Sequence, residues 1–295
     1  MLPPMQMHRV LYNSFAYADD VTIMCPSITG LQQLINICQN YSRRWRFNFN
    51  KEKSNCMIIG KCPFINEPKW YMDGHLLQNV QSLEILGNVY NHEGSSSDHV
   101  SHRLRKCRQS FYSLSSAGML YPGATTTVKT YLYNHICQPT LTYGIECMNL
   151  TENDIVNLDS AQGKLIKQSL GLNKRSHNTQ LLQAMNVKKA RELNVKKCTS
   201  LFNRIGQVAS PTRSLLLYFL SRFILYGEII PGTLLSRVIS QGQSPIKCLF
   251  SVPKMCANIQ TDGHIDSIRH LLHHENFIKP YSEEHLLVHL LTIAF

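Results

Sequence analysis

Short apolar runs separated by polar turns dominate the N-terminal part of the chain. Phe15–Tyr17 and Val21–Met24 form the first two runs, and only Ala18, Asp19 and Asp20 separate them. Two β-prone runs joined by so short a polar link predict a β-hairpin. Its turn would hold the two carboxylates next to each other.

The pattern beyond this hairpin predicts a helix, a strand and a second hairpin. Apolar residues recur at helical spacing over residues 31–45, and a short apolar run follows at Cys56–Ile59. The stretch Trp70–His75 contains Asp73 and Gly74, a pair that favours the tight turn of a hairpin.

Helical periodicity replaces the short runs from residue 98 onward. The helices that it predicts cover residues 98–117, 125–137 and 154–170. The apolar run 215–230 contains Arg222 and Glu228 and is too short for a membrane span, so we expect a buried helix there. The predicted fold class is α+β, with a small antiparallel sheet followed by a mostly α-helical region and a helical C-terminal region.

Composition points to an anionic partner. The 295 residues carry 30 Lys and Arg against 19 Asp and Glu, a formal net charge of +11. Such an excess favours nucleic acid first and an acidic membrane surface second, although a basic but inert surface would have the same composition. The ten cysteines show no paired short spacing and no signal peptide opens the chain, so we expect reduced thiols. We expect a nuclear or cytoplasmic, intracellular protein that is not secreted.

The acidic pair Asp19 and Asp20 suggests chemistry as well as structure. Adjacent carboxylates at a turn repel each other unless a cation neutralises them, and hard oxygen ligands suit Mg²⁺. Nucleotidyl transfer by two metal ions needs such a carboxylate platform. The alternative is an ordinary solvated hairpin turn, in which two Asp residues have no function beyond favouring the turn.

Several motifs in the same order resemble one enzyme family. Residues 17–20, Tyr-Ala-Asp-Asp, resemble the catalytic Tyr-x-Asp-Asp hairpin of reverse transcriptases, in the form found in non-LTR (LINE-type) retrotransposons. Asn50, Lys53 and Ser54 match the family's Asn-x-x-Lys-Ser/Thr motif. Leu86-Gly87 resembles the family's Tyr-Leu-Gly segment, with Ile85 in place of Tyr.

The resemblance continues into the helical region and covers about residues 10–205. Residues 139–146 resemble the thumb segment Pro-x-Leu-x-Tyr-Gly-x-Glu, and residues 170–172 are a Leu-Gly-Leu typical of the family. The resemblance implies three regions: the end of the palm at 1–95, a helical thumb at 96–205, and a helical C-terminal region of unknown role at 206–295.

The resemblance also implies site residues, cofactors and partners. Asp19 and Asp20 would be catalytic metal ligands, and Lys53 a catalytic charge on the pyrophosphate side. The metal would be Mg²⁺, with Mn²⁺ as an alternative. Partners would be an RNA template and a DNA primer, with dNTP in the full-length enzyme and no membrane. The nucleic-acid contacts implied are Tyr17, Leu86, Gly87, Arg103, Lys106 and Arg108, of which Leu86 and Gly87 form the primer grip.

The family also needs a third carboxylate and the fingers, upstream of the acidic hairpin. Residues 1–16 contain neither Asp nor Glu. We therefore expect a fragment of an RNA-directed DNA polymerase that is catalytically silent as this chain, with an open sheet edge beside its hairpin. The alternative is a non-catalytic nucleic-acid-binding or protein-interaction module derived from a retroelement.

The C-terminal third carries scattered cysteines and histidines. Cys248, Cys256, His264 and His270 invite a zinc interpretation, as in a zinc-dependent RNA binder. Structural zinc sites place their first two cysteines two to four residues apart, so we do not expect zinc. Residues 286–295 predict a packed terminal helix or a frame-derived tail.

Overall fold

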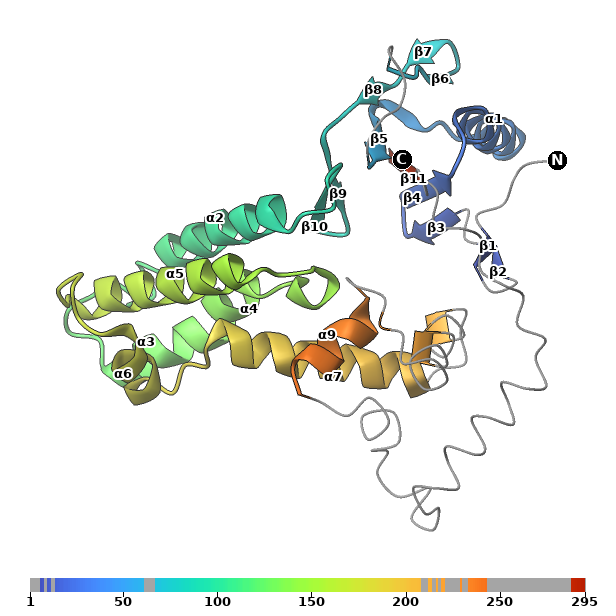
Figure 1. The fold of residues 1–295 in the computed structure, drawn as a ribbon. Coiled ribbons are helices and arrows are strands. Elements are labelled where there is room, and N and C mark those ends of the chain that lie inside the picture. Colours follow the sequence, from blue (N-terminus) through green and yellow to red (C-terminus); the bar gives the residue numbers. More distant parts are fainter. Residues whose placement is uncertain are drawn as a thin grey trace. The chain divides into compact units, whose positions relative to one another are not determined.

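The computed structural model describes residues 6–7, 10–11, 14–60, 67–207, 212–213, 216, 219–220, 229, 233–242 and 288–294, with the backbone alone at 6–7, 10–11 and 288–294. It divides into two units (Figure 1). The sheet unit consists of Met1–Ser95 with Gln260–Phe295, and the helical unit of Ser96–Ile259. The predicted border between residues 95 and 96 falls at this division, whereas the predicted third region, 206–295, is split between both units.

In its described residues, the sheet unit combines a long helix with strands of two to ten residues. Its elements are β1 (Gln6–Met7), β2 (Val10–Leu11), β3 (Ser14–Tyr17), β4 (Asp20–Cys25), α1 (Ile28–Trp45), β5 (Asn50–Ile59), β6 (Tyr71–Met72), β7 (His75–Leu76), β8 (Gln78–Asn79), β9 (Ser82–Ile85), β10 (Asn88–Asn91) and β11 (Val288–Ala294). The predicted hairpin around Asp73 and Gly74 is confirmed as β6–β7.

The main sheet has the strand order β3-β4-β11-β5-β8. β11 pairs antiparallel with both β4 and β5, so β4 and β5 run in the same direction. β5 pairs parallel with β8 at two residues, Asn55 and Cys56, whereas the other described strand pairings are antiparallel, as predicted. Small antiparallel sheets combined with helices agree with the predicted α+β class. The helix expected at the C-terminus is wrong, because residues 288–294 form a strand. Backbone pairing with β4 on one side and β5 on the other holds these residues in an extended conformation.

Apolar side chains fill both faces of this sheet. On one face Ile23 and Cys56 pack with Leu31 and Ile35 of α1 and with the fully buried Trp70. On the other, Met57 packs with Leu83. Side chains alternate between faces along a strand, which is why Cys56 and Met57 belong to different clusters.

Helix α1 begins before the predicted residue 31. The hydroxyl of Ser27 accepts a hydrogen bond from the backbone N–H of Gly30 at 3.1 Å, which caps the helix and adds its first turn. The helix ends at Trp45, as predicted, and Arg46 follows in the left-handed conformation.

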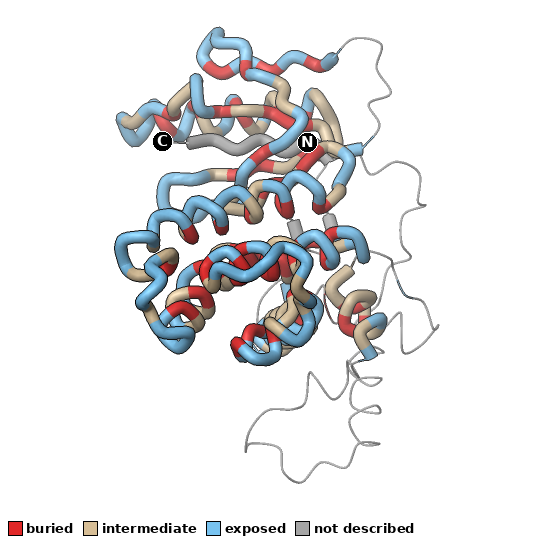
Figure 2. The backbone as a smooth tube through the Cα atoms, turned by 90° about the vertical axis from the view of Figure 1, so that its left-hand side faces the viewer, coloured by how far each residue is buried: buried red, intermediate tan, exposed pale blue. Residues whose placement is uncertain are grey.

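The helical unit consists of helices of very different length. Its elements are α2 (Ser97–Ser113), α3 (Thr126–Leu132), the π-helix η1 (Tyr133–Cys137), α4 (Gln138–Leu141), the 3₁₀ helix η2 (Ile145–Cys147), α5 (Glu152–Leu170), α6 (Asn178–Ala184), α7 (Ala190–Gln207) and α9 (Leu234–Ser240). Buried residues recur along one side of the long helices (Figure 2).

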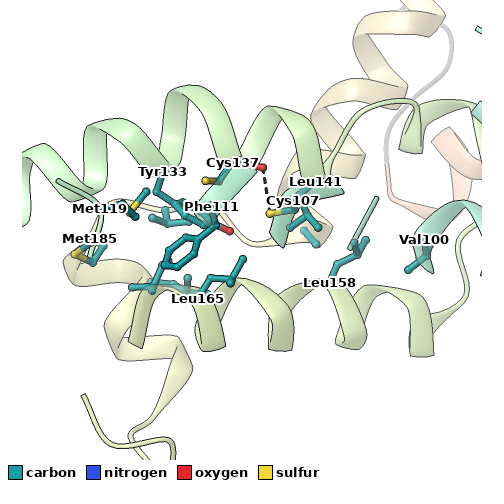
Figure 3. Close-up of a cluster of buried hydrophobic side chains, with 14 residues drawn as sticks. Val100, Cys107, Phe111, Met119, Tyr133, Cys137, Leu141, Leu158, Leu165 and Met185 are labelled. Carbon is teal, nitrogen blue, oxygen red and sulfur yellow. Dashed lines mark hydrogen bonds between the residues drawn. The ribbon is translucent and has the colours of Figure 1, made fainter. Parts of the chain in front are cut away.

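One apolar cluster joins α2, η1 and α5 (Figure 3). Phe111, Tyr133 and Leu158 are among its most deeply buried members, each at most 1 % exposed. In the run 215–230, the described residues Leu216 and Leu220 are buried against Phe202 of α7. Within the described residues, no helix has both the length and the apolar character that crossing a bilayer requires.

The predicted helix 125–137 is divided by the π-helix. The backbone N–H of Gln138 donates to the carbonyl of Tyr133, five residues back, at the end of η1. Pro139 follows and has no N–H, so it cannot donate to the carbonyl of His135 as an α-helix requires.

Candidate functional site

The acidic pair lies at the turn of the predicted hairpin, which is confirmed. β3 and β4 pair antiparallel, with Tyr17 opposite Asp20, so Ala18 and Asp19 form a two-residue turn. Asp19 and Asp20 are both exposed, and Tyr17 is 69 % exposed. We call residues 17–20 the carboxylate turn. β3 is the end strand of the described sheet, and Phe15 on it is 50 % exposed.

The backbone of the carboxylate turn is strained. Ala18 has φ +49°, the left-handed region that favours glycine. A side chain with a Cβ atom costs about 1–2 kcal/mol in that region. Such strain persists where the surrounding structure imposes it, and it gathers at functional sites.

The Asn50–Ser54 motif forms a local turn that presents a lysine. The side-chain oxygen of Asn50 accepts hydrogen bonds from the backbone N–H groups of Glu52 and Lys53, both at 3.1 Å. The Ser54 hydroxyl donates to the Asn50 carbonyl at 2.7 Å. Asn50 and Ser54 thus fix the backbone of the motif, while the side chain of Lys53 is exposed.

The sheet brings this motif and the carboxylate turn to the same edge. β11 places Ile293 opposite Val21 of β4, and the next residue, Ala294, opposite Asn50 of β5. The starts of β4 and β5 therefore lie at one edge with a single strand between them, a spacing of about 10 Å. The adjacent pair Asp19 and Asp20 shares this edge with Lys53, which is distant in sequence.

The carboxylate turn would supply two of the ligands that a magnesium ion needs. Asp19 and Asp20 supply two hard oxygen donors, and Mg²⁺ is often held by one or two carboxylates while water and substrate phosphates complete its shell. In the part of the chain that the structure describes, no group of three or more His, Cys, Asp or Glu could hold a metal ion. Cys248, Cys256, His264 and His270, at which we do not expect zinc, lie outside the described residues.

Leu86 and Gly87 form the turn of a separate hairpin, β9–β10. Both have positive φ, +49° and +78°, the combination of a type I′ turn. Leucine is unfavourable at such a position. Burial does not explain its presence, because its side chain is 44 % exposed. The turn at Asp73-Gly74 has nearly the same φ values, +47° and +75°, with a residue that favours them.

One of the three basic residues of α2 that the resemblance implies as nucleic-acid contacts is buried. Arg103 is only 8 % exposed, and its guanidinium carbon lies 5.2 Å from the centre of the Tyr143 ring. It follows Val100 and precedes Cys107 at helical spacing, which places it on the buried side. His99 is also buried, with its Nε2 atom 2.9 Å from the Tyr143 carbonyl. Lys106 and Arg108 are exposed, as predicted.

The helical unit also contains a polar hollow of about 410 Å³ between α5, α7 and α9. Its two arginines have internal partners. Arg191 forms an ion pair with Glu152. Arg237 donates from Nη1 to the carbonyls of Glu146 and Met148, both at 2.6 Å. The hollow therefore has a structural explanation and no evident ligand.

Comparison with known proteins gave no match to a family model, a curated protein or a solved structure.

Proposed function

We propose that this chain is the palm-to-thumb part of a LINE-type reverse transcriptase, an RNA-directed DNA polymerase, and that it binds the duplex of primer and template. The observation that carries the proposal is the shared sheet edge. A strained turn presents Asp19 and Asp20 there, and the Asn50–Ser54 motif presents Lys53 at the same edge. The order of the motifs along the chain supports the same assignment.

Each group would have a distinct part in binding. Asp19 and Asp20 would hold Mg²⁺, which when bound supplies charge neutralisation and orientation of phosphate oxygens. Lys53 would place a positive charge near the leaving pyrophosphate. Exposed Tyr17 extends the apolar surface beside the carboxylates.

The duplex would contact residues further along the chain. Leu86 and Gly87 would touch the sugar–phosphate backbone at the tip of their hairpin, since glycine allows a close approach. Exposed Lys106 and Arg108 would contact phosphates, whereas buried Arg103 would support Tyr143 from within the helical unit.

A second candidate is a nucleic-acid-binding module that works without metal. The observation that favours it is that the acidic pair has no third metal-binding side chain beside it in the described part of the chain. The basic composition would then be sufficient for binding to phosphates.

Magnesium dependence of duplex binding separates the two candidates. We would measure fluorescence anisotropy of an RNA–DNA duplex with and without Mg²⁺ at constant ionic strength. For the polymerase assignment, Asp19→Asn should bind as well as or better than wild type in EDTA, because a repulsive charge is lost. In Mg²⁺ the order should reverse, with several-fold weaker binding by the variant.

The matched control is Glu93→Gln, which removes one exposed negative charge outside the carboxylate turn. It should follow wild type in both conditions, apart from a small uniform gain. If Mg²⁺ has the same effect on wild type, Asp19→Asn and Glu93→Gln, the polymerase assignment fails and metal-free phosphate binding replaces it.

A further inference from the structure

Helix α1 carries an exposed apolar stripe that the sheet does not use. Ile37, Tyr41 and Trp45 lie four residues apart and are 53 %, 56 % and 63 % exposed. Residues at this spacing follow one another along one side of a helix. We call these three residues the α1 stripe. The residues of α1 that pack on the sheet, Leu31 and Ile35 among them, are separate from it.

The aromatic rings of the stripe are held in place by neighbouring rings. The centre of the Tyr41 ring lies 6.1 Å from that of Trp45 and 6.0 Å from that of Phe47. Phe47 in turn lies edge-on to the buried Phe49, with ring centres 5.2 Å apart. The exposed rings are therefore connected to the core, and little conformational freedom would be lost when a flat partner stacks on them.

The surroundings of the stripe are basic. No Asp or Glu occurs anywhere in Ile28–Trp45, and Arg43, Arg44 and Arg46 cluster at its end. Asp73 forms an ion pair with Arg43 at 2.6 Å. Arg44 and Arg46 are exposed and form no ion pair with another described residue. Arg46 holds φ +58° at the helix end, a position that favours glycine.

The basic end of the stripe lies toward the edge that carries Asp19 and Asp20. β4 begins at that edge and runs away from it, and α1 then returns the chain to the start of β5. Arg46 is only four residues from Asn50, the first residue of β5.

These observations point to a second site: we infer that the α1 stripe binds single-stranded nucleic acid. Bases stack on Tyr41 and Trp45, and the phosphates that join them contact Arg44 and Arg46. Every base has a flat face and every nucleotide a phosphate, so exposed aromatic rings beside arginines suit such a strand whatever its sequence. A purely apolar protein surface would cover the rings but would leave the clustered arginines without an anionic partner.

The fluorescence of Trp45 provides a direct readout of single-strand binding. The chain has two tryptophans, and the other, Trp70, is fully buried and donates from Nε1 to the Ile28 carbonyl at 3.0 Å. Titration of the full chain with a short oligo-dT or oligo-U in EDTA should therefore quench the emission of Trp45 through stacking. The same titration with a blunt duplex should quench it much less.

Variants test the contacts one kind at a time. Tyr41→Ala combined with Trp45→Ala should weaken single-strand binding, measured by anisotropy, roughly tenfold or more. Trp45→Phe alone should retain most of the wild-type affinity because it keeps an aromatic ring. Arg44→Ala with Arg46→Ala should lower the slope of log affinity against log salt by about 1.4. Tyr121→Ala, which removes a 64 % exposed ring elsewhere, is the matched control and should change nothing.

Two results would overturn the inference. One is unchanged Trp45 emission when the protein is saturated with the single strand. The other is equal single-strand affinity for wild type and the Tyr41→Ala, Trp45→Ala variant, with the circular dichroism of both showing the same fold.

The inference stands apart from the polymerase assignment. Single-strand binding in EDTA that depends on Tyr41 and Trp45 but not on Asp19 would support the stripe, even if Mg²⁺ had no effect on the duplex. Magnesium-dependent duplex binding without quenching of Trp45 would support the polymerase assignment alone.

Discussion

At the scale of single residues, two hairpin turns each contain a residue that does not favour its own backbone conformation. Ala18 and Leu86 both have φ +49°, at the tips of exposed hairpins. Gly, Asn and Asp tolerate a positive φ better than Ala or Leu. The β6–β7 hairpin has such a residue, Asp73, at the corresponding position. Both positions belong to motifs that resemble polymerase sites, so the strain supports a role for these side chains in binding.

Replacement of Leu86 by Asn separates stability from binding. Leu86→Asn should raise the free energy of unfolding by about 1 kcal/mol, because Asn tolerates a positive φ. The same change should weaken duplex binding if Leu86 touches the primer. Thermal melting and anisotropy on one preparation would measure both. A less stable protein would contradict the strain argument, and unchanged affinity would remove Leu86 from the primer grip.

At the scale of elements, the start of α5 is fixed by a buried carboxylate. Asp154 accepts hydrogen bonds from the Thr151 backbone and hydroxyl and, at 2.7 Å, from the Ser96 hydroxyl. Burial alone would raise the pKa of Asp154, but the hydrogen bonds from Ser96 and Thr151 outweigh it and lower the pKa below 3.8. Thr151 and Asp154 form a capping box, in which each side chain accepts a hydrogen bond from the other residue's backbone N–H. The hydrogen bond from Ser96 connects this box to the start of α2.

The sign of this pKa shift predicts a loss of stability in acid. A carboxyl whose pKa is lower in the folded state stabilises the protein above its unfolded pKa, and that contribution is lost as the pH falls through the folded pKa. Asp154→Asn should cost about 1–2 kcal/mol at pH 7. The difference from wild type should shrink as the pH falls below 3.8, as urea unfolding would show. A constant difference at every pH would contradict this role.

In helices α2 and α1, the spacing of residues in the sequence does not show which side chains are exposed. The basic residues of α2 do not share one face, because Arg103 lies on the side that packs against Tyr143. The α1 stripe was not predicted, although the spacing of Ile37, Tyr41 and Trp45 is visible in the sequence. An apolar residue at helical spacing is usually assigned to the core, and only its exposure in the folded structure separates a core position from a surface position.

At the scale of the whole molecule, the C-terminal strand β11 completes the sheet of the N-terminal region. It separates β4 from β5 and pairs with both, so its backbone hydrogen bonds are used on both sides. The relative position of the carboxylate turn and Lys53 therefore depends on residues more than two hundred positions away in the sequence.

A proline in β11 tests this arrangement. Leu291 lies opposite both Ile23 and Cys56, and Leu291→Pro would remove an N–H from the middle of the sheet. We expect a loss of about 3 kcal/mol or more in the sheet unit. Hydrogen exchange should rise in β4 and β5 but not in α5 of the helical unit. Unchanged protection of β4 and β5, or the same loss in Leu291→Val, would contradict a central position of β11.

The sequence by itself determined the features that depend on near neighbours. The hairpin at Asp19 and Asp20, the turn at Asp73-Gly74 and helix α5 follow from short-range periodicity and turn chemistry, which a local pattern records.

Only the tertiary structure decided which distant segments meet. The insertion of β11, the burial of Arg103 against Tyr143 and the shared edge of Asp19 and Lys53 all arise from contacts between remote parts of the chain. No local pattern specifies a pairing partner, because the same alternation or helical spacing fits many neighbours. The resemblance of the motifs suggested the chemistry, and the sheet brought the residues that would perform it to one edge.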